Sequence, residues 1–261
     1  MKRILLTACV LLISLLAPAL PSLGATLEQV KERGILSICA NRAALPFSSD
    51  DLTQPGFQLE VAQAIAKIIG VGLRVEWISF RREARYVNCD AFPGSVVTEE
   101  AEQGPVKLTK PYYSSGYLLL LPRGAEGVKT FADLDGRKIG VEHESWAHYI
   151  LNTRGLKTAV YADNIEIIEA VEKGEVEAGA VVAAYVGWYL KQHPDSPLKI
   201  ADGYIPEPDL RWNVAVGLRY ADPALKDAVD QALDQLQREG TIQSILAKYG
   251  IPYYPPFTPT R

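Results

Sequence analysis

Histidine and cysteine are scarce in this chain, and their scarcity limits the chemistry open to it. The 261 residues include three cysteines and three histidines, His143, His148 and His193. The histidines do not stand at ligand spacing with the cysteines, so the sequence gives no zinc pattern. We therefore expect no metal and no cofactor.

Basic runs and long apolar runs are also missing. The formal net charge is −4, and no run of Lys or Arg forms a stripe, which argues against nucleic-acid binding. After residue 24 no apolar run approaches the about 20 residues that cross a bilayer. No nucleophile-elbow motif is present. Membrane-spanning proteins and hydrolases of that type are thus disfavoured.

The N-terminus has the pattern of a secretory signal peptide. Lys2 and Arg3 precede an apolar run over 4–16, and Ser22 and Gly24 supply small residues for cleavage. The run is about 13 residues long, too short to span a bilayer, although an uncleaved anchor is the alternative. We read 1–24 as a cleaved signal peptide and expect a monomer in the periplasm. The remaining 237 residues, with a net charge of −6, suit one large or two small domains.

Two cysteines, Cys39 and Cys89, remain after this cleavage. An even number in an oxidising compartment predicts a disulfide. The bridge would close a loop of about 50 residues, worth roughly 4 kcal/mol in the chain-entropy model. Two buried free thiols are the alternative.

Strand-like and helix-like segments alternate along the chain, which predicts an α/β fold with parallel sheets and right-handed crossovers. In that arrangement the first and third strands are neighbours, which would bring the two cysteines within bonding reach. The proline- and aromatic-rich tail 252–259 predicts irregular packing along the surface. The expected strands are 35–40, 73–78, 89–92, 117–121, 138–141, 158–161, 178–182 and 212–217. The expected helices are 27–33, 57–69, 145–153, 164–173, 185–192, 223–239 and 241–249.

Six short motifs follow one another along the chain: Leu45–Ser48, Gly56–Phe57, Cys89–Ala91, Thr109–Tyr117, Leu134–Gly140 and the end from Gly240 to Gly250. In this order they resemble the family-3 periplasmic solute-binding proteins, which include the polar-amino-acid receptors of ATP-driven (ABC) importers. The resemblance covers essentially the whole chain after residue 24. It implies a protein that binds a small organic solute and presents it to an ABC permease.

The resemblance also implies a two-lobe fold of the type II class. Each lobe would be a mostly parallel sheet flanked by helices. Lobe one would comprise 25–117 and 218–261, and lobe two 122–212. The strands 118–121 and 213–217 would be the two hinge crossovers.

Three polar clamps of the amino-acid receptors are missing here. Within Thr98–Glu102, Ala101 stands where the family has an arginine that grips the ligand carboxylate. Receptors of the family offer backbone N–H groups to an anion at the start of a helix in lobe two. Here Glu144 stands at that place and would repel an anion. The segment Val182–Tyr185 lacks the acidic residue that binds the ligand ammonium. We therefore expect a ligand other than an ordinary amino acid.

Some segments resemble another branch of the family, the subunits associated with quinoprotein alcohol and methanol dehydrogenases. They are Cys39–Ala40, Arg81–Arg82, Gly217–Arg219 and Ile245–Pro252. The alternative is therefore an accessory protein that docks on a periplasmic quinoprotein dehydrogenase. A third, weaker reading is an enzyme on the same fold, a dehydratase or a lytic transglycosylase, with Glu142 or Glu144 as general acid. We expect that the protein is not an enzyme.

The candidate ligand-binding residues follow the expected strands or begin the expected helices, because open α/β sheets bind ligands at the carboxyl ends of their strands. Phe47 could instead be core, Pro93–Gly94 a simple turn, and the two arginines solvated or paired with Glu83. The candidates are Phe47, Ser48, Arg81, Arg82, Pro93, Gly94, Ser95, Tyr113, Ser114, Glu144, Ser145, Trp146 and Tyr185.

Overall fold

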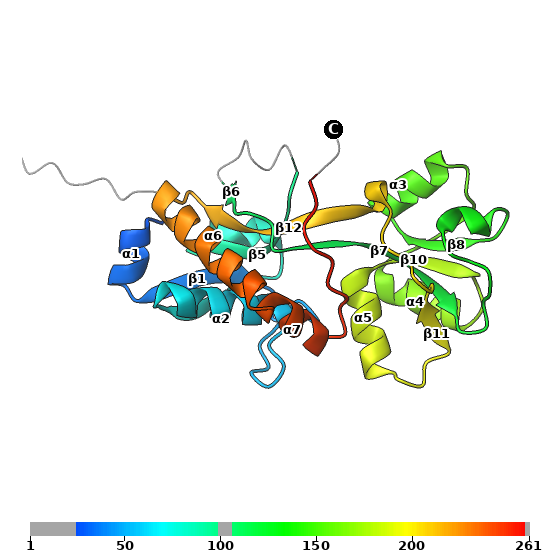
Figure 1. Ribbon diagram of the computed structural model, residues 1–261, viewed down its shortest axis with the longest axis horizontal. Helices are drawn as coiled ribbons and strands as arrows, with labels where there is room; N and C mark the ends of the chain where they lie inside the picture. The colour runs from blue at the N-terminus through cyan, green and yellow to red at the C-terminus, as the bar shows by residue number, and fades with distance from the viewer. Residues whose placement is uncertain (1–24, 99–105, 259–261) are drawn as a thin grey trace, which may run out of the picture.

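Most buried apolar side chains form two large clusters, one centred in each lobe, and Ala184 of the second lobe is buried in the first cluster. The computed structural model describes residues 25–98 and 106–258, so the expected signal peptide lies outside the described residues. Figure 1 shows the two bodies side by side, joined by long strands. The first core contains Phe57 and Leu233, and the second contains Leu119 and Ile167. The α/β fold with two lobes is confirmed.

The first lobe has a parallel sheet in which β1 lies between β4 and β5. In α2, Phe57, Val61 and Ile65 are buried at helical spacing, as the sequence predicts. Gly70 ends α2 in the left-handed conformation, with φ +85°. The elements of this lobe are α1 (Leu27–Glu32), β1 (Ile35–Ala40), β2 (Ala43–Ala44), β3 (Ser48–Ser49), α2 (Phe57–Ile69), β4 (Gly72–Trp77), β5 (Ala91–Val96), β6 (Val106–Leu108), α6 (Pro223–Arg238) and α7 (Thr241–Lys248), with the 3-10 helix η1 (Arg81–Arg85).

The second lobe repeats the strand–helix pattern with β10, β8 and β9 parallel to one another. α4 packs closely on this sheet because Gly140 and Gly179 leave room for Ile167. A Cβ at either glycine would lie within 2.9 Å of the Ile167 Cγ2 atom. The elements are η3 (Phe131–Leu134), β8 (Ile139–Glu142), α3 (Trp146–Thr153), β9 (Thr158–Tyr161), α4 (Asn164–Glu172), β10 (Ala178–Val182), α5 (Ala183–Gln192), β11 (Leu198–Ile200) and η4 (Pro208–Leu210).

Two long antiparallel strands, β7 (Tyr113–Pro122) and β12 (Arg211–Arg219), connect the lobes. They pair from Tyr113 opposite Val214 to Gly116 opposite Arg211. β7 then pairs with β10 and β11 in the second lobe, whereas β12 pairs with β5 and β6 in the first. One continuous sheet of ten strands therefore runs through both lobes.

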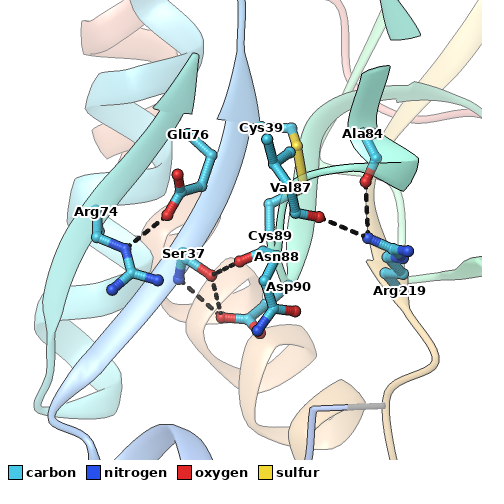
Figure 2. Close-up of a disulfide and its surroundings, with 10 residues drawn as sticks. All are labelled: Ser37, Cys39, Arg74, Glu76, Ala84, Val87, Asn88, Cys89, Asp90 and Arg219. Carbon is cyan, nitrogen blue, oxygen red and sulfur yellow. Dashed lines mark hydrogen bonds and ion pairs between the residues drawn. A yellow bond between two sulfur atoms is a disulfide. The ribbon is translucent and has the colours of Figure 1, made fainter. Parts of the chain in front are cut away.

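The predicted disulfide is present between Cys39 of β1 and Cys89, just before β5, with Cα atoms 5.5 Å apart (Figure 2). The predicted neighbouring positions of β1 and β5 are confirmed as well, since Ile38 pairs with Ala91 in parallel. Both cysteines are buried in a small cluster with Ala84.

Polar contacts hold the loop around the disulfide in place. The buried Asp90 carboxylate accepts hydrogen bonds from the Ser37 N–H and hydroxyl, both at 2.8 Å, and also pairs with Arg33. Figure 2 shows Arg219 on the other side, where its guanidinium donates to the carbonyls of Ala84 and Val87 at 2.8 and 3.0 Å. The segment before β5 is thus attached to both β1 and β12.

Some element boundaries differ from the sequence prediction. β5 starts at Ala91, not at Cys89, although the Asp90 backbone already bonds to Ser37 of β1 and to Arg219 of β12. β5 then continues through Pro93, and the register opposite β12 shifts between Ala215 and Gly217. Such an irregularity accommodates a residue without an N–H group. The short strands β2, β3, β6 and β11 were not predicted.

We expect removal of the disulfide to destabilise the first lobe without changing its fold. Replacing both cysteines (Cys39→Ala with Cys89→Ala) removes a cross-link between residues 50 positions apart and so raises the entropy of the unfolded chain. The free energy of unfolding should fall by about 4 kcal/mol. Urea unfolding of the variant and the oxidised parent protein measures the difference. A loss below about 1 kcal/mol would contradict the chain-entropy account, and two alkylatable thiols in the oxidised protein would contradict the bond itself.

Candidate functional site

A cavity of about 240 Å³ opens in the first lobe, at the carboxyl ends of β1, β4 and β5. This is the edge of an open α/β sheet at which ligands bind. The lining residues whose side chains the structure describes carry no charge and combine apolar surface with amides, hydroxyls and backbone groups. They are Cys39, Ala40, Asn41, Ala44, Phe47, Ser48, Gln58, Ile78, Ser79, Phe92, Pro93, Gly94 and Ser95.

The rim of the cavity is ordered by hydrogen bonds around Asn41. Its side-chain amide donates to the Ser79 carbonyl at 3.3 Å and its side-chain oxygen accepts from the Ala43 N–H at 2.9 Å. The Ser48 hydroxyl donates to the Asn41 carbonyl at 2.6 Å. The ends of β1 and β4 and the β2–β3 hairpin therefore hold one another in position.

Gly56 allows α2 to start against the hairpin. With φ +92°, it lies so close that a Cβ would be 2.5 Å from the Phe47 carbonyl oxygen. The N–H of Gln58 donates to that same carbonyl at 3.0 Å. The first turn of α2 is thus directed at the cavity, and Gln58 enters it.

The Gln58 side chain lies directly on the backbone of β5. A Cβ at Gly94 would be only 2.0 Å from its Nε2 atom. Because Gly94 has no side chain, the amide of Gln58 lies across the cavity with donor and acceptor atoms available to a bound molecule.

Tyr185 of α5 brings the second lobe against this cavity. Its ring contacts Phe47 edge-on, with centroids 5.4 Å apart, and Phe47 also contacts the core residue Phe57 at 5.4 Å. The alternatives for Phe47 are therefore not exclusive, since the ring both packs on the core and lines the cavity.

A carboxylate, Glu142, lies at the carboxyl end of β8 in the second lobe. The buried Asn164 donates its amide to Glu142 at 2.9 Å and accepts from the Val182 N–H at 2.8 Å. Burial raises the pKa of Glu142 and Asp163 adds to the rise, while the Asn164 hydrogen bond opposes it. Among the described residues, none of the ion pairs includes Glu142.

Tyr185, which contacts Phe47, lies within the electrostatic influence of Glu142. Burial raises the pKa of Tyr185, and the charges of Glu142 and Asp163 raise it further. The second lobe therefore presents an acidic and aromatic face beside Phe47, the aromatic residue of the cavity.

The first turn of α3 is occupied by the protein itself. Ser145 caps the helix and accepts from the His148 N–H at 3.1 Å. Burial raises the pKa of Tyr117, and hydrogen bonds from the Ala147 N–H and the Ser145 side chain oppose the rise. The Tyr117 hydroxyl therefore faces the N–H groups at this helix start.

The predicted site residues fall into three groups. Phe47, Ser48 and Pro93–Ser95 line the cavity of the first lobe. Glu144 and Ser145 line a separate hollow on α3. The remaining predicted residues whose side chains the structure describes line neither of these hollows: Arg82, Tyr113, Ser114, Trp146 and Tyr185.

Three members of the last group contact other parts of the chain. Tyr113 is buried in the first core, and burial raises its pKa above the ordinary value. Trp146 is half exposed and donates to the Asp209 carbonyl at 2.7 Å. The exposed Arg82 lies 5.2 Å from the centroid of the Phe80 ring. Arg81 belongs to η1, and its side chain lies outside what the structure describes.

Sequence reasoning missed three polar residues of the cavity: Asn41, Gln58 and Ser79. Asn41 follows β1 directly, and Ser79 stands two residues after β4. The rule that ligands bind at strand carboxyl ends could have found both. Gln58 carries a weaker signal, its place in the first turn of a helix that opens with Gly56.

The described residues contain neither a metal cluster nor a membrane helix. No three His, Cys, Asp or Glu side chains gather there as metal ligands. Over the same part of the chain, no helix has the length and apolar character needed to cross a membrane.

Comparison with known proteins identifies the family. The model for bacterial extracellular solute-binding proteins, family 3, matches residues 36–252. The chain belongs to this family. The L-cystine-binding protein TcyJ of Escherichia coli is 28% identical over 233 residues, which is 85% of each chain. A "Probable amino-acid ABC transporter-binding protein" of Haemophilus influenzae is 26% identical over 94% of this chain and 96% of its own.

Solved structures of this family share its fold. The L-cystine solute receptor of Neisseria gonorrhoeae, in an unliganded open conformation, has a TM-score of 0.75 at 18% identity, covering 87% of this chain and 97% of its own. A curated enzyme is also similar: the membrane-bound lytic murein transglycosylase F of Pseudomonas putida is 25% identical over 86% of this chain, but only 48% of its own length. The relatives of this family-3 chain are mainly binding proteins.

Two glycines beside the cavity should respond differently to alanine. In Gly94→Ala the new methyl meets only the end of the flexible Gln58 side chain, so the stability should change little while Gln58 is displaced. In Gly56→Ala the methyl meets the Phe47 backbone at a positive φ, and unfolding should become easier by about 1–3 kcal/mol. Urea unfolding of both variants measures this. An equal loss in both would contradict the described packing of Gln58.

Proposed function

We propose that this family-3 protein is a periplasmic receptor that closes its two lobes around a small organic solute and delivers it to the permease of an ABC importer. The observation that carries the proposal is the uncharged cavity at the strand ends of the first lobe, with Tyr185 of the second lobe against its rim residue Phe47. The predicted signal peptide supports the periplasmic location.

The connection between the lobes supports closure. Only short stretches of β7 and β12 lie between the two cores, because Tyr113 and Val214 belong to the first core and Tyr117 and Leu210 to the second. We place the hinge in 114–116 and 211–213, where a few element positions would absorb the rotation of the lobes. The first lobe then comprises 25–113 and 214–258, and the second 117–210.

The ligand we propose is neutral or cationic rather than zwitterionic. Among the described side chains, the cavity lining includes no cation to bind a carboxylate; the side chain of Arg81 and the expected arginine position, Ala101, lie outside the described residues. On the second lobe Glu142 has no basic partner among the described residues and could bind an ammonium group. The family relatives that bind L-cystine and other amino acids make those compounds the necessary comparison.

A thermal-shift screen tests this function. The mature protein is heated with amino acids including L-cystine, dicarboxylates, sugars, alcohols, aldehydes and polyamines. A ligand at about 1,000 times its Kd should stabilise the protein by roughly 4 kcal/mol. For a chain of this size that is a Tm increase near 10 °C. We expect one class of neutral or cationic compounds to give it.

Two variants of α2 serve as site and control. Gln58→Ala removes an amide from the cavity, whereas Gln63→Ala changes an exposed residue on the same helix. Only Gln58→Ala should weaken binding of the compound found, by about tenfold, or 1.4 kcal/mol. No stabilising compound at all would overturn the receptor proposal, and the strongest shift with ordinary amino acids would overturn the ligand class.

Binding of a cationic ligand should depend on pH through Glu142. Because burial raises its pKa, Glu142 is protonated at a higher pH than an ordinary glutamate, and protonation removes the charge that binds the cation. The affinity should therefore fall as the pH is lowered through this raised pKa. Isothermal titration calorimetry between about pH 4 and 8 measures it.

Substitution isolates the contribution of Glu142 to this pH dependence. Glu142→Gln should weaken binding at neutral pH and flatten the profile, while Glu144→Gln, two residues away and exposed, should change neither. Stability changes in the opposite direction to affinity: the raised pKa of Glu142 favours the fold at low pH, and this contribution is lost as the pH rises through it. A profile that Glu142→Gln leaves unchanged would contradict the assignment.

A further inference from the structure

The C-terminal segment 252–258, here called the hinge strap, crosses both strands that join the lobes. Figure 1 shows it leaving α7 and passing over β7 and β12 between the two bodies. The Ser114 N–H donates to the Tyr254 carbonyl at 2.8 Å, and the two residues form an isolated antiparallel bridge. The Ser114 hydroxyl also donates to the Pro255 carbonyl at 3.1 Å.

The strap binds the second connecting strand through Asn213. The Asn213 amide donates to the Phe257 carbonyl at 2.6 Å, and its side-chain oxygen accepts from the Phe257 N–H at 3.1 Å. Asn213 pairs directly with Ser114 in the β7–β12 ladder, and both side chains are about 5% exposed. The strap is therefore bonded to both connecting strands at one paired position of the ladder, Ser114 and Asn213.

Packing attaches the strap to both lobes. Tyr253 packs against the first core and Tyr254 against the second. Just before the strap, Gly250 touches Gly187 of α5 so closely that a Cβ at Gly187 would lie 2.3 Å from the Gly250 carbonyl oxygen. Further along, the Arg211 guanidinium lies 4.3 Å from the centroid of the Phe257 ring.

Rotation of the lobes cannot leave these contacts unchanged. The strap bonds to Ser114 and Asn213, within the short stretches that must change their backbone angles when the lobes move. Pro252, Pro255 and Pro256 restrict the backbone of the strap itself, so it has little freedom to follow. We propose that the hinge strap limits the rotation of the two lobes and so sets the equilibrium between open and closed forms.

Distances between the lobes test this without any ligand. Spin labels are placed at Lys67→Cys in α2 and Lys157→Cys before β9, two exposed lysines in different lobes. Double electron–electron resonance then compares the full chain with chains ending at Tyr253 and at Thr258. Ending at Tyr253 removes the contacts to Ser114 and Asn213 and should broaden or shift the distance distribution. Ending at Thr258 keeps every contact described and should leave the distribution unchanged.

A second variant keeps the strap and removes one attachment. Asn213→Leu keeps the branched shape and the number of side-chain heavy atoms but loses both hydrogen bonds to Phe257. Hydrogen exchange of the Ser114 amide should become about tenfold faster, and the distance distribution should broaden. This variant decides the question if the shortened chain does not fold.

An unchanged distance distribution in a folded protein that lacks the strap contacts would overturn the proposal. So would Asn213→Leu with parent-like distances. The proposed function fails on a different result, a screen without any stabilising compound, so the two failures are distinguishable.

Discussion

The antiparallel pairing of β7 with β12 is the interaction on which the rest of the structure depends. The four paired positions from Tyr113 to Gly116 join two sheets that otherwise have separate cores. Through this pairing one ten-stranded sheet extends across both lobes, and the second lobe is held beside the cavity of the first. All the lining residues given for the cavity belong to the first lobe, so any contact from the second lobe depends on this connection.

The cavity depends in turn on a rigid strand edge. Cys39 lines it, and the bond to Cys89 joins the end of β1 to the segment that leads into β5. Asp90 and Arg219 anchor the same segment to Ser37 and to β12. Groups that bind a ligand must be held in fixed positions. These contacts fix the segment that leads into β5, the strand that carries Pro93 and Gly94. The stabilising bonds and the candidate site therefore share one set of strands.

Local patterns predicted most of the fold but only part of the site. Phe57, Val61 and Ile65 at helical spacing, and glycines at helix ends, located the helices because each signal lies within one element. The disulfide followed from the even cysteine count in an oxidising compartment and agreed with the predicted strand order. Gln58 was missed because its position over Gly94 depends on a contact between α2 and β5 that no local pattern encodes. The tail was expected to pack irregularly on the surface. Its backbone is irregular, and it also bonds to Ser114 and Asn213, far away in the sequence.

The central claim is that the two lobes close over a solute in the first-lobe cavity. Small-angle X-ray scattering of the mature protein, with and without the most stabilising compound of the screen, tests it most directly. The account predicts a smaller radius of gyration when the compound is bound, and, at about ten times the parent's Kd, roughly half of that decrease in Gln58→Ala, whose affinity should be about tenfold lower. A radius that stays the same on saturation of the parent would contradict closure around the ligand.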